Sequence, residues 1–168
     1  PGHADQPGLN CYDISDGSLL WRYPTSVDAP GVFTESMAAD GDTVYVNYTE
    51  SGAGYVGAFF LQPEFIPPVK WITQVNPPGT YPSKPMVVSS SRVFLLLTDM
   101  SPQSDSFLLE IDTASGDILN EERYNHWANG LFYGNMALSG DDLLVTGLRD
   151  WLGYGDRWKY AVAVLRSN

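Results

Sequence analysis

Three segments of the chain repeat one another at a nearly constant spacing. They run from Met37 to Val46, from Met86 to Leu95 and from Met136 to Val145, at spacings of 49 and 50 residues. Each segment has the end of an apolar strand, a short run of small polar residues and the start of a second apolar strand, which is typical of a β-hairpin. One hairpin cannot bury both of its faces alone. A repeat of this length therefore predicts the stacked blades of a β-propeller.

The composition is that of a globular chain and excludes several classes of partner. The 168 residues are 43% hydrophobic and 13% aromatic, which predicts one folded domain over 1–168. No apolar run approaches the roughly 20 residues of a membrane helix, so we expect a soluble protein. The net charge of −11 repels phosphate backbones and anionic lipid headgroups. The sequence thus predicts neither a nucleic-acid partner nor membrane insertion.

The rest of the chain divides into strands on the same period. A complete repeat contains four strands, A to D, counted outward from the propeller axis, and the repeated hairpin supplies A and B. The predicted segments are a half-blade at 9–23 with strands C and D only, blades at 33–73 and 82–123, and a partial blade at 133–166 without strand D. Met37, Met86 and Met136 occupy matching positions of strand A, where adaptable side chains would fill the gap near the axis.

One string in the half-blade carries a family pattern. Cys11-Tyr-Asp-Ile-Ser-Asp-Gly-Ser-Leu-Leu-Trp21 resembles the repeat of the PQQ-like, or quinoprotein alcohol dehydrogenase-like, β-propellers, which has the form A-x-D-x-x-T-G-x-x-x-W. The segment from Glu110 to Asn120 fits the same frame without the tryptophan, and Trp71 ends the frame in the middle repeat. The resemblance implies that Trp21 and Trp71 dock neighbouring blades. It does not imply an activity, because the repeat occurs both in dehydrogenases and in assembly scaffolds.

The predicted blades do not close a ring. They number about three and a half, whereas the resemblance implies six to eight, and exposed sheet edges favour aggregation. We therefore expect part of a seven- or eight-bladed ring, completed by a second chain, a second copy or another part of the same precursor. A closed four-bladed ring is the alternative, in which two C strands, 9–14 and 159–165, would compete for one place.

The candidate binding surface consists of the loops between strands D and A and between strands B and C. These loops are long, as in Tyr48 to Tyr55, whereas the turns between A and B are short. Aromatic rings beside Asn, Asp and Arg suit a sugar or planar ligand, and also a protein partner. The candidate ligand- or partner-binding residues are Asn125, His126, Trp127, Arg149, Asp150, Trp151, Tyr154, Asp156, Arg157 and Trp158.

Isolated residues add little chemistry. Asn47-Tyr48-Thr49 is an N-glycosylation acceptor, which we expect on a surface loop. Cys11 is the single cysteine, and we expect it to be a structural thiol. Asp40-Gly-Asp42 lacks the further ligands of a calcium loop, so we expect a turn and no metal site.

The sequence contains no catalytic motif. We expect a non-catalytic, extracytoplasmic binding or assembly module without a cofactor, which engages another protein chain or the rest of its own propeller. A fragment of a quinoprotein-type oxidoreductase is one alternative, and the resemblance would then imply PQQ and calcium. The adjacent-cysteine disulfide of many such enzymes is excluded by the single cysteine. A propeller that binds carbohydrate through its aromatic loops is the other alternative.

Overall fold

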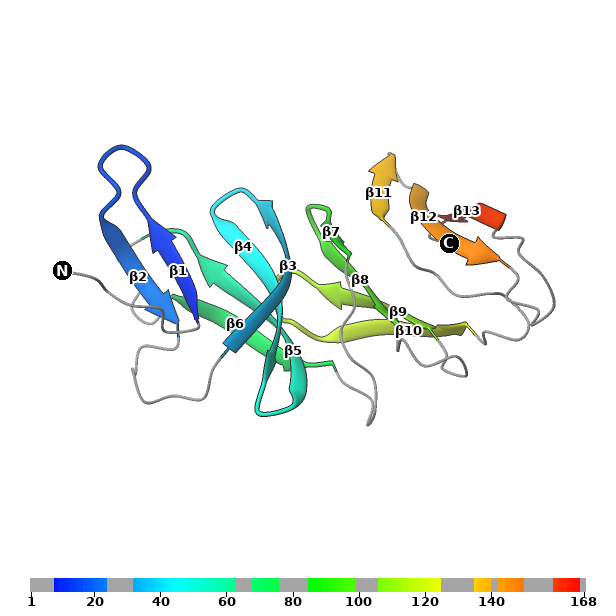
Figure 1. Ribbon diagram of the computed structural model, residues 1–168, viewed down its shortest axis with the longest axis horizontal. Helices are drawn as coiled ribbons and strands as arrows, with labels where there is room; N and C mark the ends of the chain where they lie inside the picture. The colour runs from blue at the N-terminus through cyan, green and yellow to red at the C-terminus, as the bar shows by residue number, and fades with distance from the viewer. Residues whose placement is uncertain are drawn as a thin grey trace. The chain divides into compact units, whose positions relative to one another are not determined.

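A computed structural model describes most of the chain. The described residues are 8–23, 32–62, 68–75, 85–98, 106–124, 135–139, 142–149 and 159–166. All of their regular secondary structure is β-strand (Figure 1), so the predicted all-β fold class is confirmed. None of these residues forms a helix that could cross a membrane. The chain divides into two compact units, Pro1–Asn76 and Pro77–Asn168, which are described separately.

The first unit contains two antiparallel sheets. The strands β1 (Leu9–Tyr12) and β2 (Leu19–Tyr23) form a two-stranded sheet. A four-stranded sheet follows, in chain order, from β3 (Val32–Asp40), β4 (Thr43–Glu50), β5 (Ala53–Phe60) and β6 (Val69–Gln74). Every connection within a sheet joins neighbouring strands, so the small sheet is a β-hairpin and the larger one is an antiparallel meander.

The second unit repeats this arrangement. Its four-stranded sheet consists of β7 (Met86–Val88), β8 (Arg92–Thr98), β9 (Ser106–Asp112) and β10 (Ile118–Tyr124). A three-stranded sheet consists of β11 (Met136–Ser139), β12 (Asp142–Arg149) and β13 (Lys159–Arg166). The strands lie over the four segments that the sequence predicted, with ends that differ by a few residues.

The three repeated segments form three hairpins of the same register. Met37 pairs with Val46, Met86 with Leu95, and Met136 with Val145. The predicted hairpins are therefore confirmed. Because side chains alternate between the faces of a strand, equal register also places equivalent residues on equivalent faces of the three sheets.

The family-like pattern corresponds to the third and fourth strands of a repeat. Its first and last positions are direct cross-strand partners in all three copies: Cys11 with Trp21, Ala58 with Trp71, and Glu110 with Asn120. Trp71 thus occupies the last position of the frame although the turn before it is longer. The frame describes a hairpin whose two ends lie opposite each other.

The Asp and Gly that recur in the frame form the turn of that hairpin. In the first copy Asp13 Oδ1 accepts hydrogen bonds from the backbone N–H and the hydroxyl of Ser15, at 2.8 and 2.6 Å. These bonds lower the pKa of the Asp13 carboxyl. The N–H of Gly17 donates to the carbonyl of Asp13 at 2.8 Å, and Gly17 has a φ of +73°. This left-handed conformation explains why glycine stands there.

The third copy forms the same turn. Asp112 Oδ1 accepts hydrogen bonds from the backbone N–H groups of Ala114 and Ser115 at 2.8 and 2.7 Å. The N–H of Gly116 donates to the carbonyl of Asp112 at 3.0 Å, and Gly116 has a φ of +80°. The Asp and Gly are thus explained by local turn geometry, without a ligand.

The prediction of a long loop from Tyr48 to Tyr55 is wrong. β4 and β5 continue to Glu50 and Ala53, which pair directly, so the connection is a two-residue turn. Its residues Ser51 and Gly52 have φ values of 51° and 80°, as a type I′ hairpin turn requires. The alternation of apolar residues across the turn was obscured by the small residues Gly54 and Gly57, which lie inside β5.

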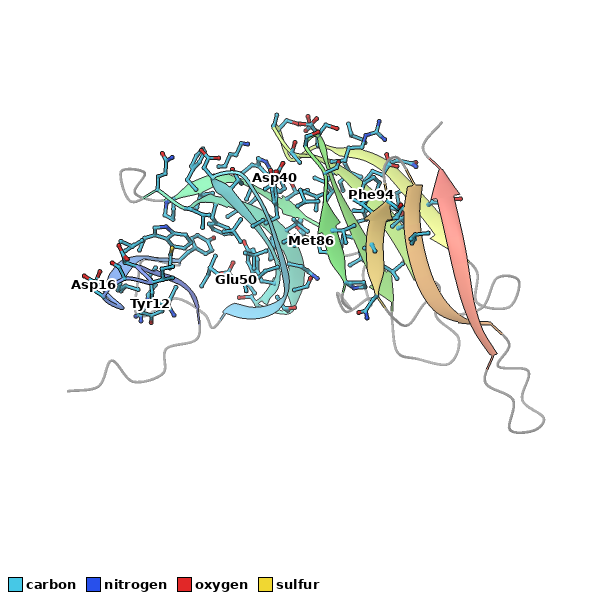
Figure 2. The ribbon with its side chains drawn as sticks, turned by 90° about the horizontal axis from the view of Figure 1, so that it is seen from above. Tyr12, Asp16, Asp40, Glu50, Met86 and Phe94 are labelled. Atoms are coloured by element: carbon cyan, nitrogen blue, oxygen red, sulfur yellow. The ribbon has the colours of Figure 1, made fainter. Side chains whose placement is uncertain are left out.

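The core of the first unit lies between its two sheets. Leu9 and Trp21 pack on Val46, Tyr48 and Phe59 of the larger sheet. The rings of Trp21 and Phe59 stack with their centroids 6.1 Å apart. Gly57 leaves room for this packing, because a Cβ there would come within 2.6 Å of the Phe59 ring. The opposite end of the small hairpin, with Tyr12 and Asp16, is exposed (Figure 2).

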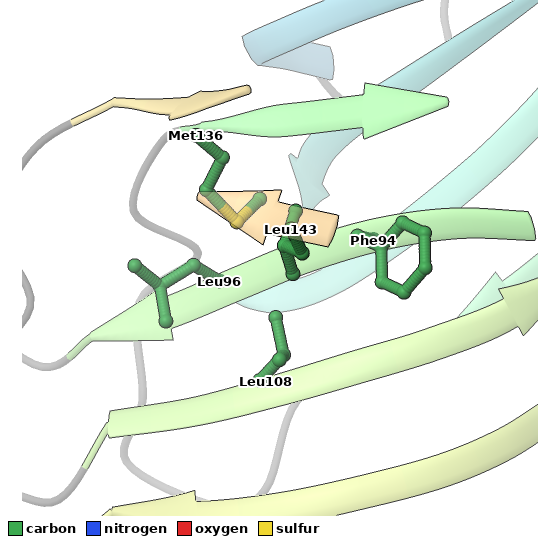
Figure 3. Packing of buried hydrophobic residues seen from close by; sticks show 5 residues of the cluster. All are labelled: Phe94, Leu96, Leu108, Met136 and Leu143. Atoms are coloured by element: carbon green, nitrogen blue, oxygen red, sulfur yellow. The ribbon is translucent and has the colours of Figure 1, made fainter. Parts of the chain in front are cut away.

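The core of the second unit is also an interface between two sheets. Phe94, Leu96 and Leu108 come from the four-stranded sheet, and Met136 and Leu143 come from the three-stranded sheet (Figure 3). Val87 and Leu138 pack at the edge of this cluster. The strands β7 and β11 also contact each other. Within this unit, consecutive repeats therefore pack face to face with their first strands adjacent.

Candidate functional site

The predicted aromatic loop surface falls almost entirely outside the described residues. Arg149 is described as the last residue of β12, where it pairs with Lys159. The other nine candidate residues, at 125–127 and 150–158, are not among the described residues. The backbone shows only that 150–158 links two strand ends that are direct partners. The proposed ligand contacts of this group stay predictions.

The prediction that Asn47 lies on a surface loop is wrong. Asn47 belongs to β4, between β3 and β5, and is 0% exposed. A glycan on its side-chain nitrogen would have no space in this fold. The tripeptide pattern identifies an acceptor sequence but does not show which face of a strand carries it.

Asn47 is nevertheless an unusual core residue. Neither Oδ1 nor Nδ2 has a hydrogen-bond partner among the described residues. The Oγ atom of Ser36, its direct partner on β3, is also buried without a partner there. By register, Asn47 is equivalent to Leu96, which is a core residue of the second unit. A polar residue thus replaces an apolar one at a position that the repeat buries, and unpaired buried polar atoms cost stability.

Substitution of Asn47 by leucine is therefore expected to stabilise the first unit. Removing two unpaired polar atoms should raise the free energy of unfolding by about 1–2 kcal/mol. Chemical denaturation would measure the change, and Asn47→Ala, which removes the amide but leaves a cavity, is the matched control. A lower stability of both variants than of the unmodified chain would show that the amide makes a bond which the described residues do not reveal.

Tyr48 lies on the other face of the same strand. It is buried, and its ring stacks on that of Tyr55 with the centroids 5.5 Å apart. Burial, with a smaller contribution from Tyr23, raises the pKa of the Tyr48 hydroxyl above its usual value. A phenol with a raised pKa stays protonated at neutral pH. It is therefore a core residue in this geometry and not a general base.

The two tryptophans of the frame are both buried. Trp21 is 5% exposed and contacts the neighbouring sheet of its own unit through Phe59. Trp71 is also buried, and its ring lies 5.8 Å from that of Tyr45 in the same sheet. Their role in docking successive blades stays a prediction. Cys11 is half-buried beside Trp21, and partial burial raises the pKa of its thiol, which disfavours the reactive thiolate.

The described residues offer little for metal or acid–base chemistry. No group of three or more His, Cys, Asp or Glu side chains in that part of the chain could hold a metal ion. Arg92 and Glu110 form an ion pair at 2.8 Å across β8 and β9. It spans adjacent strands of one sheet and fits a structural role.

The most distinctive surface feature is a pair of incomplete sheets. In both four-stranded sheets the third strand, β5 or β9, pairs on both edges. In the described part of the chain, the corresponding strands β1 and β13 pair on one edge only, β1 with β2 and β13 with β12. The sequence of β13, Lys-Tyr-Ala-Val-Ala-Val-Leu-Arg, has charges at its ends alone and no proline. It lacks the features that normally protect an edge strand from pairing.

Comparison with known proteins adds no relative to this description. No protein-family model matches the chain, and no curated protein matches it.

Proposed function

We propose that this chain is a non-catalytic binding or assembly module of the PQQ-like β-propeller type, and that it works outside the cytoplasm by engaging a protein partner or the rest of its own propeller. The open edge of β13 carries the proposal. No other described strand pairs with one edge of β13, whose centre is uncharged, and such an edge is a template for β-strand addition.

The repeat geometry supports the propeller part of the proposal. Antiparallel sheets whose strands follow one another in chain order, hairpins of one register, and face-to-face packing of sheets within each unit are all properties of propeller blades. The Asp–Gly turns at Asp13 and Asp112 give the family-like pattern a common structure. The location outside the cytoplasm follows from the resemblance alone.

The native composition of the protein tests the proposal. The protein would be purified from its source without denaturant, and its mass measured by light scattering, followed by the intact masses of all chains. We expect the native protein to exceed 18.5 kDa, because it contains a second chain, contains a second copy, or is a longer chain that carries the remaining blades. A stable single chain of 18.5 kDa would contradict the proposal.

A further inference from the structure

Two aspartates of the first unit stand directly before a glycine at a tight turn. They are Asp16, in the turn between β1 and β2, and Asp40, at the end of β3 (Figure 2). The glycines that follow them, Gly17 and Gly41, have left-handed φ values of 73° and 59°. A Cβ atom added at either glycine would meet nothing within 4 Å. The two turns therefore offer the same uncrowded Asp–Gly sequence to a reaction of the backbone.

An Asp–Gly sequence can rearrange its own main chain. The peptide nitrogen of the glycine attacks the side-chain carboxyl carbon of the aspartate, and the new C–N bond closes a five-membered succinimide. The N–H proton and the carboxyl OH leave as one water molecule. Hydrolysis returns this water and breaks one of the two carbonyl–nitrogen bonds, so the product is either aspartate or isoaspartate. The reaction needs no oxidant, reductant or cofactor, and glycine favours it because no side chain hinders the nitrogen.

Hydrogen bonds hold both reacting groups at Asp16. The Oδ1 atom of Asp16 accepts a hydrogen bond from the backbone N–H of Ser18 at 2.8 Å. The N–H of Gly17 donates to the carbonyl of Asp13 at 2.8 Å. The bond from Ser18 lowers the pKa of the Asp16 carboxyl, and an ionised carboxylate is a poor electrophile. Both hydrogen bonds must break before the nitrogen of Gly17 can attack.

The reacting groups at Asp40 are not held in this way. Asp40 is exposed and pairs with Thr43 through the backbone, so Gly41 and Asp42 form a two-residue turn. Among the described residues, none donates a hydrogen bond to the Asp40 carboxylate and none accepts one from the N–H of Gly41. The nearby hydroxyl of Thr43 donates to Asp42 instead, at 3.1 Å. The carboxyl carbon of Asp40 can therefore approach the nitrogen of Gly41 while the hairpin stays folded.

We propose that Asp40 is a site of spontaneous succinimide and isoaspartate formation in the folded protein, and that the turn at Asp16 is protected from the same reaction. This inference goes beyond the proposed function and does not depend on it. Isoaspartate adds one methylene group to the main chain between β3 and β4. Because Asp40 pairs directly with Thr43, the longer turn should open the last pair of this hairpin and speed hydrogen exchange at Thr43.

Ageing of the purified protein at mildly acidic pH tests the proposal. Isoaspartate would be located by peptide mass spectrometry with electron-transfer fragmentation, which separates Asp40 from Asp16 and from Asn129–Gly130, outside the described residues. In the folded protein, isoaspartate should accumulate at Asp40 at least about tenfold faster than at Asp16, because two hydrogen bonds must break first at Asp16. In guanidinium chloride, where neither turn persists, the two sites should react at similar rates.

Asp40→Glu is the matched variant, because its longer side chain would have to close a six-membered ring. It should remove the product at position 40 and leave both the rate at Asp16 and the unfolding temperature unchanged, since residue 40 is exposed. Equal rates at Asp16 and Asp40 in the folded protein would overturn the inference. So would a folded protein that forms no isoaspartate at Asp40 while the denatured protein does. Neither result changes the native mass, which tests the proposed function separately.

Discussion

Replacement of Trp21 by alanine is expected to lower the free energy of unfolding of the first unit by about 3–5 kcal/mol. The indole is almost fully buried and lies against Phe59 and its neighbours in the four-stranded sheet. The two-stranded sheet to which it belongs has too few strands to be stable alone. We therefore expect β1 and β2 to detach from the larger sheet when the ring is removed.

Urea denaturation followed by tryptophan fluorescence, with hydrogen exchange of β1 and β2, would measure this loss. Tyr12→Ala is the matched control, because Tyr12 is an aromatic residue of the same small sheet that is 53% exposed. That change should cost less than about 0.5 kcal/mol. Equal effects of the two substitutions would show that Trp21 does not hold the sheets together.

Two proline substitutions in β13 are expected to have different effects, one on the stability of the chain and the other on its assembly. The N–H groups of an edge strand point alternately to the neighbouring strand and away from the sheet. Of two adjacent variants, Ala163→Pro and Val164→Pro, one removes a bond to β12 and the other removes an outward N–H group. The variant that removes the outward N–H group should leave the separated chain folded but weaken its assembly up to about tenfold, since a lost hydrogen bond of about 1.5 kcal/mol corresponds to that factor.

Thermal unfolding of each separated variant and titration with the partner chain would identify the two effects. Glu121→Pro and Glu122→Pro provide the control pair, because they make the same change in β10, the outer strand of a complete sheet. They should not weaken assembly. If both β13 variants bind the partner as tightly as the unmodified chain, strand addition at β13 is excluded.

The parts of the fold that follow local rules could be predicted from sequence. The hairpin at Met37 could be recognised because apolar alternation and small turn residues fix its register locally. The turn at Asp13 and Gly17 could be recognised for the same reason, since one side chain and one left-handed glycine define it.

Burial could not be predicted in the same way. Met37 and Met136 have equivalent sequences around them, yet one is exposed and the other buried, because burial depends on which strands the preceding sheet provides. Asn47 was misplaced on a loop because glycines and polar residues interrupt the alternation of β4 and β5, while its neighbours in space come from other strands. The predicted loop residues around Trp151 follow no strand or helix period. Their aromatic and polar composition could be read from the sequence, but the positions of their side chains could not.

Hydrogen exchange of β13 is the most direct test of strand addition at its open edge. In the separated chain, the N–H groups of β13 that do not bond to β12 should exchange rapidly, because no other strand pairs with that edge among the described residues. In the native complex, the same groups should be protected by at least about a hundredfold, because a backbone bond to an added strand must break before they exchange. Equal exchange of these groups in the separated chain and in the complex would show that β13 is not the edge at which the protein is completed.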